Sequence, residues 1–389
     1  MGERVLYLSY DGLTDPLGQS QILPYLAGLA GAGHRISIIS FEKDDKLETG
    51  GERIRQFCRQ NNLTWHPLRY HKRPPVFSTV YDVWCMRQSA RKLHAQESFT
   101  IVHCRSYITA LVGRWLKNRH AMRFVFDMRG FWADERVEGG LWNLNSPLYR
   151  RVYNFFKRQE HKFLNDADAV TVLTVAAREE LLSWGVADKI TVIPCCVDLQ
   201  LFDRRAVAAA DTAAWRTRLG ISPRAYVLLY LGSIGTWYLW NEMVLFFERL
   251  KKEHTEAKFL ILTPDPEKVI PHPDFIVRTV SRQEVPTLIS VADASVCFIK
   301  PSFSKKGSSA TKMAEVLAMG VPVITNPGWG DVAFLADKLN NLVVTDPYAQ
   351  QTPIIPVSSE PGSNAFFTGF FSLEEGVRKY DVVYRGVRQ

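Results

Sequence analysis

Cysteine is scarce in this 389-residue chain, and its six copies follow no pattern that a disulfide framework or a zinc site would need. Cys195 and Cys196 are adjacent, whereas the cysteines of a zinc ligand pair have residues between them. Scattered, unpaired cysteines fit a reduced compartment best. We therefore expect a cytoplasmic protein without a metal site.

Long hydrophobic runs are also missing. The longest apolar stretch, residues 226–240, is interrupted by Gly232 and Gly235 and is shorter than the about 20 residues that a membrane-spanning helix needs. Residues 5–8 form an apolar run that is too short for a signal peptide. We expect neither a transmembrane helix nor a signal peptide, but a peripheral position on the inner face of a membrane stays open.

Two binding signatures are absent as well. Gly28, Gly31 and Gly33 superficially suggest a dinucleotide fingerprint, but they precede a predicted strand instead of following it, which is typical of a helix C-terminus. The basic residues come without a recognition helix or a stacking motif. We expect no nucleic acid partner.

The charge that is present is basic. The net charge is +8, and residues 1–200 hold 27 Lys/Arg against 21 Asp/Glu. This excess indicates an anionic partner, although a merely soluble basic protein would show it too. Residues 69–77 and 149–158 interleave basic and aromatic side chains, as segments on anionic membrane surfaces do, and ordinary packing helices with exposed charges are the alternative.

Short β-branched or aromatic runs alternate with amphipathic stretches along the chain, which is typical of doubly wound parallel sheets. The length favours two domains. We predict an α/β protein with two Rossmann-like domains: residues 1–200, a linker at 201–222, residues 223–370, and a C-terminal helix at 371–389 that crosses toward the first domain. Residues 346–369 resemble an irregular linker.

Residues 308–331 carry the strongest functional pattern: a polar loop, a short helix, a glycine stop, a buried strand and a glycine-rich turn. Ser309 and Thr311 can cap or flank the helix start, where backbone N–H groups favour phosphate. Lys312 adds a cation, and Glu315, one turn further, could accept two hydroxyls of a ribose. Phosphate followed by sugar describes a nucleotide-sugar, whereas an ordinary capped helix is the alternative.

Other candidates follow predicted strands, at the edge where α/β sheets bind ligands. In the first half, the loop at 11–20 offers Gly18 and Gln19, and the segment at 124–135 offers Asp127, Arg129 and Trp132, with His103 on the preceding strand. In the second half, the candidates are Gly232, Ser233, Lys300, Lys305 and Lys306. A diphosphate would neutralise the lysine cluster, and a solvated basic loop is the alternative reading.

Together these residues resemble the retaining, GT-B glycosyltransferases of family 4. The resemblance covers nearly the whole chain and rests on the loop at 18–20 and on segments 167–170, 192–198, 230–233, 311–324 and 371–373. The Asp-x-Arg-Gly sequence at 127–130 resembles that of a subgroup. Any one of these motifs is weak, but their order along the chain is specific.

The resemblance implies a sugar transferase with its active site between the two domains. The donor, a nucleoside-diphosphate sugar, would be held by Gly18, Gln19, Gly232, Ser233, Lys300, Lys305, Ser309, Thr311, Lys312 and Glu315. The acceptor, a glycan or a lipid-linked molecule, would meet His103, Arg129 and Trp132. Asp127 would orient or deprotonate the acceptor hydroxyl, and no cofactor or metal ion is expected.

Two departures from the family pattern matter. Gly307 stands eight residues before Glu315, where the family has its first glutamate, and Trp237 and Tyr238 occupy the region of a usual lysine. Contacts to the transferred sugar must therefore differ, and the lysine that neutralises the diphosphate is not identified. A catalytically inactive GT-B module that serves as an assembly partner is the competing hypothesis.

Overall fold

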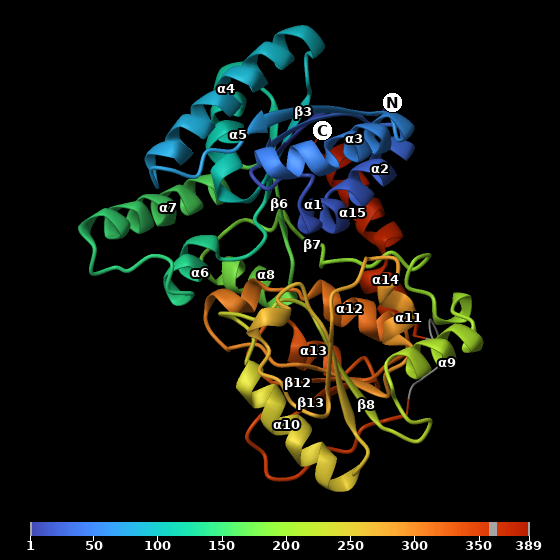
Figure 1. Ribbon diagram of the computed structural model, residues 1–389. Coiled ribbons are helices and arrows are strands. Elements are labelled where there is room, and N and C mark those ends of the chain that lie inside the picture. Colours follow the sequence, from blue (N-terminus) through green and yellow to red (C-terminus); the bar gives the residue numbers. More distant parts are fainter. Residues whose placement is uncertain (1, 358–363, 388–389) are drawn as a thin grey trace. The chain divides into compact units, whose positions relative to one another are not determined.

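The computed structural model describes residues 2–357 and 364–387, and it divides into two units (Figure 1). The N-terminal unit comprises Met1–Pro194 and Leu373–Gln389, and the C-terminal unit comprises Cys195–Ser372. Residues 1, 358–363 and 388–389, which belong to the predicted first domain, linker and C-terminal helix, lie outside the described residues.

The N-terminal unit is built on a seven-stranded parallel sheet with the order β3-β2-β1-β4-β5-β6-β7. The sheet is fully parallel because each strand returns through a helix, as the alternating sequence pattern predicts. The strands are β1 (Arg4–Ser9), β2 (Arg35–Glu42), β3 (Leu63–Arg69), β4 (Ile101–Arg105), β5 (Arg123–Asp127), β6 (Ala169–Val172) and β7 (Ile190–Val192). The helices are α1 (Pro16–Gln21), α2 (Leu23–Gly31), α3 (Asp44–Gln60), α4 (Phe77–Glu97), α5 (Ser106–His120), α6 (Trp132–Glu138), α7 (Pro147–Asp166), α8 (Val175–Ser183) and α15 (Leu373–Gly386).

The C-terminal unit has a six-stranded parallel sheet with the order β10-β9-β8-β11-β12-β13. Its strands are β8 (Val227–Leu231), β9 (Lys258–Leu262), β10 (Phe275–Arg278), β11 (Ala294–Cys297), β12 (Val323–Thr325) and β13 (Leu342–Val344). Its helices are α9 (Ala209–Arg218), α10 (Trp240–Glu253), α11 (Val285–Ile289), α12 (Thr311–Ala318), α13 (Val332–Ala336) and α14 (Ala365–Phe371), with 3-10 turns η1 (Arg204–Ala206), η2 (Pro266–Lys268) and η3 (Ser304–Gly307). The predicted α/β class with two Rossmann-like sheets is confirmed.

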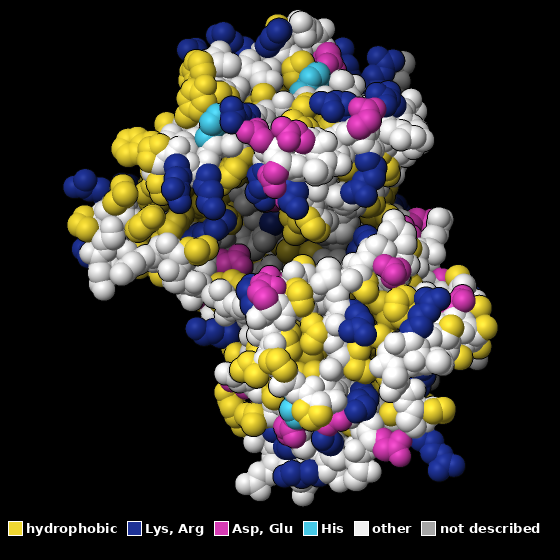
Figure 2. Space-filling view, in the orientation of Figure 1, with side chains coloured by type: hydrophobic (Ala, Val, Ile, Leu, Met, Phe, Trp, Pro, Cys, Tyr) yellow, Lys and Arg dark blue, Asp and Glu magenta, His cyan; other side chains and the backbone are white. Residues whose placement is uncertain are grey.

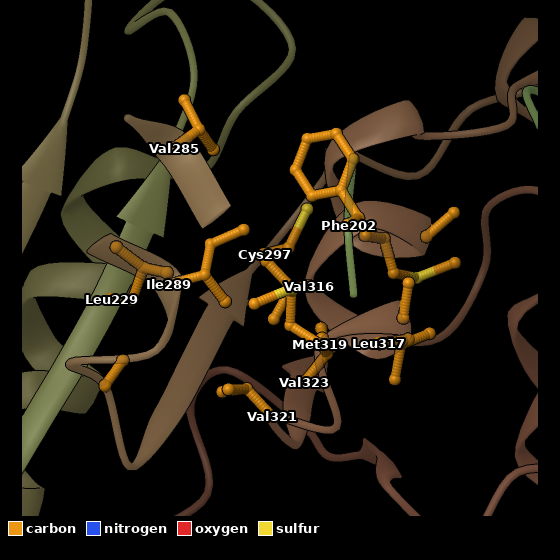
Figure 3. Close-up of a cluster of buried hydrophobic side chains, with 14 of the residues drawn as sticks. Phe202, Leu229, Val285, Ile289, Cys297, Val316, Leu317, Met319, Val321 and Val323 are labelled. Atoms are coloured by element: carbon orange, nitrogen blue, oxygen red, sulfur yellow. The ribbon is translucent and has the colours of Figure 1, made fainter. Parts of the chain in front are cut away.

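The linker predicted at 201–222 is not a free connection. Phe202, Leu219 and Ile221 are buried in the core of the C-terminal unit, and α9 contacts α11. Figure 3 shows Phe202 in the same cluster as Cys297 and Val316. The chain therefore enters the second unit at Cys195, because the apolar side chains of this segment have a core to cover.

The C-terminal helix α15 belongs to the N-terminal unit, where it packs against α2. His34, which directly precedes β2, lies 2.8 Å from Asp381 on this helix. Tyr380 and Tyr384 of α15 are buried in the same unit. The last helix of the chain thus completes the core of the first unit.

An aromatic stack on α10 generates a stability prediction. The ring of Phe247 is fully buried and stacks on Phe259 with centroids 5.2 Å apart. Phe247→Ala should lower the free energy of unfolding of the C-terminal unit by about 3–5 kcal/mol, because it removes this ring and leaves a cavity. Urea unfolding measures the change. Leu245 on the same helix is exposed, so Leu245→Ala should stay within about 0.5 kcal/mol; equal losses in both variants would contradict this account of the core.

Candidate functional site

Lys312 lies in the first turn of α12 and reaches the loop that follows β8. Its Nζ is 3.4 Å from the ring centroid of Tyr238 and 4.7 Å from that of Tyr230, and it donates a hydrogen bond to the Tyr230 hydroxyl at 3.3 Å. Gly232 has a φ of +133°, and a Cβ at this position would collide with the Lys312 side chain. Glycine at 232 therefore allows the ammonium group to lie against this loop.

The charge of Lys312 is poorly compensated. Burial lowers the pKa of Lys312 to about 8, although the nearby Cys297 and Glu315 act in the opposite direction. Among the described residues, no carboxylate lies within ion-pair distance of its Nζ. Lys312 is half-buried. A partly desolvated cation without a counterion is unfavourable, so an anion bound here would be stabilised.

The N-terminus of α12 lies beside this lysine along the chain. Ala310 is the N-cap residue, and across residues 2–357 and 364–387 no side chain caps the helix start. Ser309 instead accepts a hydrogen bond from the backbone N–H of Cys195 at 3.1 Å, and Thr311 is the first helical residue. Both flank the helix start without capping it, which leaves its first-turn N–H groups without a side-chain acceptor.

Glu315 is buried on the same helix, one turn from Lys312. Its Oε1 lies 2.9 Å from Nη1 of Arg282, whose guanidinium lies 5.2 Å from the ring centroid of Phe202. Burial raises the pKa of Glu315, and Arg282 and Lys312 oppose that rise. The sequence prediction missed Arg282, because its partner lies 33 residues away and only the fold joins them.

The remaining lysines differ in their surroundings. The Nζ of Lys305 lies 3.8 Å from the ring centroid of Trp237, and this lysine is buried. Lys300 is exposed, and its backbone N–H donates to the Trp237 carbonyl at 2.9 Å. Ser233 is exposed in the loop after β8, where its carbonyl accepts a hydrogen bond from the Tyr230 hydroxyl at 2.6 Å. The rings of Trp237 and Tyr238 thus each contact the ammonium group of one lysine, Lys305 and Lys312 respectively.

Gly18 and Gln19 lie in α1 of the N-terminal unit. A Cβ on Gly18 would collide with the backbone of Gly12 and Leu13, so packing of α1 on the preceding loop already requires this glycine. Gln19 donates to the Thr14 carbonyl at 2.9 Å and accepts from Arg53 at 2.6 Å. These internal contacts give both residues a structural role, and their predicted contact with a donor stays a prediction.

Asp127 ends β5 in a buried cluster of charged groups. Thr171 donates a hydrogen bond to Asp127 Oδ1 at 3.0 Å. His103 Nε2 and Arg105 Nη1 both lie 3.7 Å from Asp127 Oδ2, and Arg129 Nη1 lies 3.9 Å from Oδ1. These three distances exceed hydrogen-bond length, so charge and not direct bonding dominates the cluster. The structure brings the predicted residues Asp127, His103 and Arg129 together.

The protonation states in this cluster follow from burial and from the arginines. Burial alone would raise the pKa of Asp127, but Arg129, His103 and Arg105 together lower it to about 2. Burial lowers the pKa of His103, so its imidazole is neutral at pH 7 and its contact with Asp127 is no salt bridge. Asp127 is therefore ionised throughout the physiological range.

Three tyrosines complete the cluster, and the sequence prediction missed all of them together with Arg105. The Tyr384 hydroxyl lies 2.7 Å from Nδ1 of His103, and the rings of Tyr7 and Tyr380 lie 4.6 and 5.3 Å from the His103 ring. Tyr380 and Tyr384 come from α15, about 280 residues further along the chain. The signal that could have identified Tyr380 and Tyr384 is the return of α15 to the first unit.

Trp132 belongs to a different group. It begins α6 and stacks on Tyr107 with ring centroids 5.7 Å apart, and Phe156 packs edge-on against it at 4.9 Å. The guanidinium of Arg136 lies 5.1 Å from its ring centroid. Trp132 is half-buried, so its predicted acceptor role would use only the remaining part of its surface.

The described ranges 2–357 and 364–387 contain no group of three or more His, Cys, Asp or Glu side chains that could hold a metal ion. Within the same ranges, no helix has the length and hydrophobicity to cross a membrane. The candidate groups instead gather after the central strands β4 and β5 of one sheet and β8 and β11 of the other, at the edge where α/β sheets bind ligands.

Each of the two units contains a Rossmann-like parallel sheet. The chain enters the second unit at Cys195, and its last helix belongs to the first unit. These features define the GT-B fold. The family model described as "Glycosyl transferase 4-like domain" matches residues 19–196, so this part of the chain is similar to that domain.

Individual glycosyltransferases are similar to the chain as well. A D-inositol 3-phosphate glycosyltransferase of Kineococcus radiotolerans is 29% identical over 147 residues, which is 37% of this chain and 32% of the relative's length. A glycosyltransferase from Rickettsia africae has a TM-score of 0.68 at 15% identity and covers 100% of this chain and 99% of its own. HepE of Anabaena, solved with UDP and glucose, has a TM-score of 0.63 at 12% identity and covers 99% and 98%. At 15% and 12% identity, these two similar structures establish the fold of the chain and not its function.

The Arg282–Glu315 pair generates a second prediction. Arg282→Met should destabilise the C-terminal unit by roughly 1–3 kcal/mol at neutral pH, less than a fully buried pair would lose, because Arg282 is partly exposed. The folded pKa of Glu315 is already raised, so stability is lost as pH rises, and the variant should lose more at pH 8 than at pH 5. Thermal unfolding at both pH values measures this; equal losses at both would rule out an uncompensated Glu315 carboxylate as the cause.

Proposed function

We propose that the chain is a retaining glycosyltransferase that moves a sugar from a nucleoside-diphosphate sugar to a hydroxyl group of a glycan or a lipid-linked acceptor. The family match of residues 19–196 and the GT-B fold support the transferase class. The observation that carries the donor assignment is Lys312, a half-buried cation without a carboxylate partner among the described residues, beside an uncapped helix start. A diphosphate supplies the missing negative charge.

In this proposal Lys312 and the first-turn N–H groups of α12 stabilise the diphosphate as it leaves, which is the largest expected contribution to catalysis. Lys305 is the second candidate cation, held over Trp237. Glu315 would accept the ribose hydroxyls, with Arg282 keeping its carboxylate ionised. Transfer proceeds without a metal ion or another cofactor, and the acceptor hydroxyl attacks from the face that the diphosphate leaves.

Asp127 has an electrostatic role in the proposed mechanism. A pKa of about 2 makes its carboxylate a weak base near neutral pH, because a general base works best with a pKa near the operating pH. The carboxylate would instead hold Arg105 and Arg129 in place, and Arg129 is the least buried side chain of the three. His103 and Trp132 remain the other proposed acceptor-side residues.

The competing function is a catalytically inactive GT-B module that assembles with a partner, suggested by Gly307 in the place of the family's first glutamate. The donor-binding features around Lys312 count against it, because an inactive module has no need for a desolvated cation. Turnover of any nucleotide-sugar by the purified protein, read as release of the nucleoside diphosphate, separates the two functions.

The proposed diphosphate site leads to a direct test. Lys312→Met should weaken binding of UDP about 10- to 100-fold, since a hydrogen bond to a charged group contributes about 1.5–3 kcal/mol. Isothermal titration calorimetry measures the affinity. Lys306→Met is the matched control, because Lys306 is an exposed lysine in the 3-10 turn η3 that precedes α12, and it should stay within about twofold. A stronger loss in the control than in Lys312→Met would place the phosphates elsewhere.

The lowered pKa of Lys312 predicts how binding depends on pH. The bound diphosphate requires the charged lysine, whose pKa in the free protein is about 8. UDP affinity should therefore be constant from pH 7 to about 8 and fall as pH rises further. Lys312→Arg stays charged and should remove this fall. A flat profile in the unmodified protein up to pH 9.5 would show that Lys312 does not contact the ligand.

Asp127 can be tested by its pH profile as well as by its loss. Asp127→Asn should lower kcat/KM at least about tenfold, because Arg105 and Arg129 lose the buried carboxylate beside them and Arg105 keeps only Asp11, at 3.4 Å, as a counter-charge. In the unmodified enzyme, titration of Asp127 should cause no fall in kcat/KM between pH 7 and pH 4, since Asp127 stays ionised there. Full activity of Asp127→Asn would refute any role in catalysis, and an acidic limb that this variant abolishes would restore the general-base role.

A further inference from the structure

Helix α4 turns large apolar side chains toward solvent. Its inner face buries Ser78, Asp82, Met86, Ala90 and Leu93. On the outer face, the exposed fractions are 71% for Phe77, 65% for Val80, 50% for Tyr81 and 54% for Trp84. Their i, i+3, i+4 and i+7 spacing places these four side chains, called the α4 stripe below, on one side of the helix.

The α4 stripe is held in position from beneath. Asp82 accepts hydrogen bonds from the Tyr10 hydroxyl at 2.8 Å and lies 2.6 Å from Nδ1 of His71. The Tyr81 ring packs edge-on against His71 with centroids 5.1 Å apart and stacks on Trp84 at 5.9 Å. The aromatic side chains are thus presented by a fixed helix and not by a loose loop.

The surroundings of the α4 stripe carry one sign of charge. Lys72 and Arg73 precede it and Arg87 and Arg91 follow it, all exposed. The two carboxylates of α4 lie elsewhere: Asp82 is buried, and Glu97, at the last turn, accepts a hydrogen bond from Ser37. The outer face of this helix therefore combines aromatic rings with uncompensated positive charge.

The basic surface continues onto the neighbouring helices. Helix α5 contacts both α4 and α7, and Figure 2 shows Lys/Arg and hydrophobic side chains side by side over this part of the unit. Residues 69–97, 106–120 and 147–166 together contain fourteen Lys/Arg and four Asp/Glu. Four of these cations are paired with carboxylates, namely Arg69, Arg114, Lys117 and Lys157. On α7, Phe155 is exposed among Arg150, Arg151 and Arg158, whereas Tyr149 and Tyr153 are half-buried.

We propose that the α4 stripe docks on an anionic lipid surface. Its aromatic side chains would enter the headgroup region, where such rings are favoured, and the basic side chains of α4, α5 and α7 would contact the lipid phosphates. Positive charge spread over three adjacent helices matches an extended anionic surface better than the localised charge pairs of a protein interface. The proposal goes beyond the transferase function and does not depend on it.

This assignment changes the surface expected from the sequence. Of the two predicted basic and aromatic segments, 69–77 contributes one exposed ring, Phe77, together with Lys72 and Arg73, and 149–158 contributes one exposed ring, Phe155. The main anchors, Val80, Tyr81 and Trp84, lie further along α4, where no basic residue stands beside them in the sequence. The helix brings them to one face with the flanking arginines.

Vesicle flotation tests the proposal with the full-length protein. It should float with phosphatidylcholine vesicles that contain 30% phosphatidylglycerol and not with pure phosphatidylcholine, and 0.5 M NaCl should weaken binding. Tyr81→Ser combined with Trp84→Ser should lower the partition coefficient at least about tenfold, and Lys72→Gln combined with Arg91→Gln should lower it and reduce its salt dependence.

Ile270→Ser is the matched control, because Ile270 is even more exposed but lies in the C-terminal unit, and it should bind vesicles as the unmodified protein does. UDP-induced thermal shifts in the absence of lipid verify that each variant is folded, and they report separately on the donor site. The proposal is overturned if the unmodified protein does not float with anionic vesicles, which is the result expected when a partner protein covers the α4 stripe. It is also overturned if the protein with Tyr81→Ser and Trp84→Ser binds vesicles as well as the Ile270→Ser control.

Discussion

The candidate donor site depends on one electrostatic constraint, the charge of the half-buried Lys312. Tyr230 and Tyr238 face the ammonium group with their rings, and Gly232 leaves it the room it needs. Aromatic rings attract a cation but do not neutralise it. Glu315, one turn away, is engaged with Arg282. The site is therefore preorganised for a ligand that brings negative charge.

Parallel sheets explain why each unit gathers its polar groups at one edge. Strands that run in the same direction all end there, so residues distant in sequence become neighbours, such as Asp127 with Arg105 and Gly232 with Lys312. The two clusters differ in character. In the N-terminal unit, Asp127 is flanked by two arginines, whereas in the C-terminal unit Lys312 lacks a carboxylate partner among the described residues.

The sequence predicted the sheets and α12 well, because buried parallel strands and glycine stops have strong local patterns. The edge strands β3 and β13 lack such a pattern, because they are half-buried or only three residues long. It placed Asp127 correctly at a strand end but could not foresee the pKa of about 2, which depends on Arg105 and Arg129 in space. Arg282, Tyr380 and Tyr384 are contacts between distant segments, and no local pattern marks them.

The most direct test of the central claim is a thermal-shift screen of the unmodified protein with UDP-, GDP-, ADP- and CMP-sugars. A ligand at about 100 times its dissociation constant adds about 2.7 kcal/mol to the stability of the unit that binds it. The account predicts a concentration-dependent rise in Tm with a nucleoside-diphosphate sugar and with the matching free diphosphate, and a much smaller rise with CMP-sugars, which have a single phosphate. No shift with any of these ligands, or an equal shift with the monophosphate sugar, would contradict a diphosphate site at Lys312.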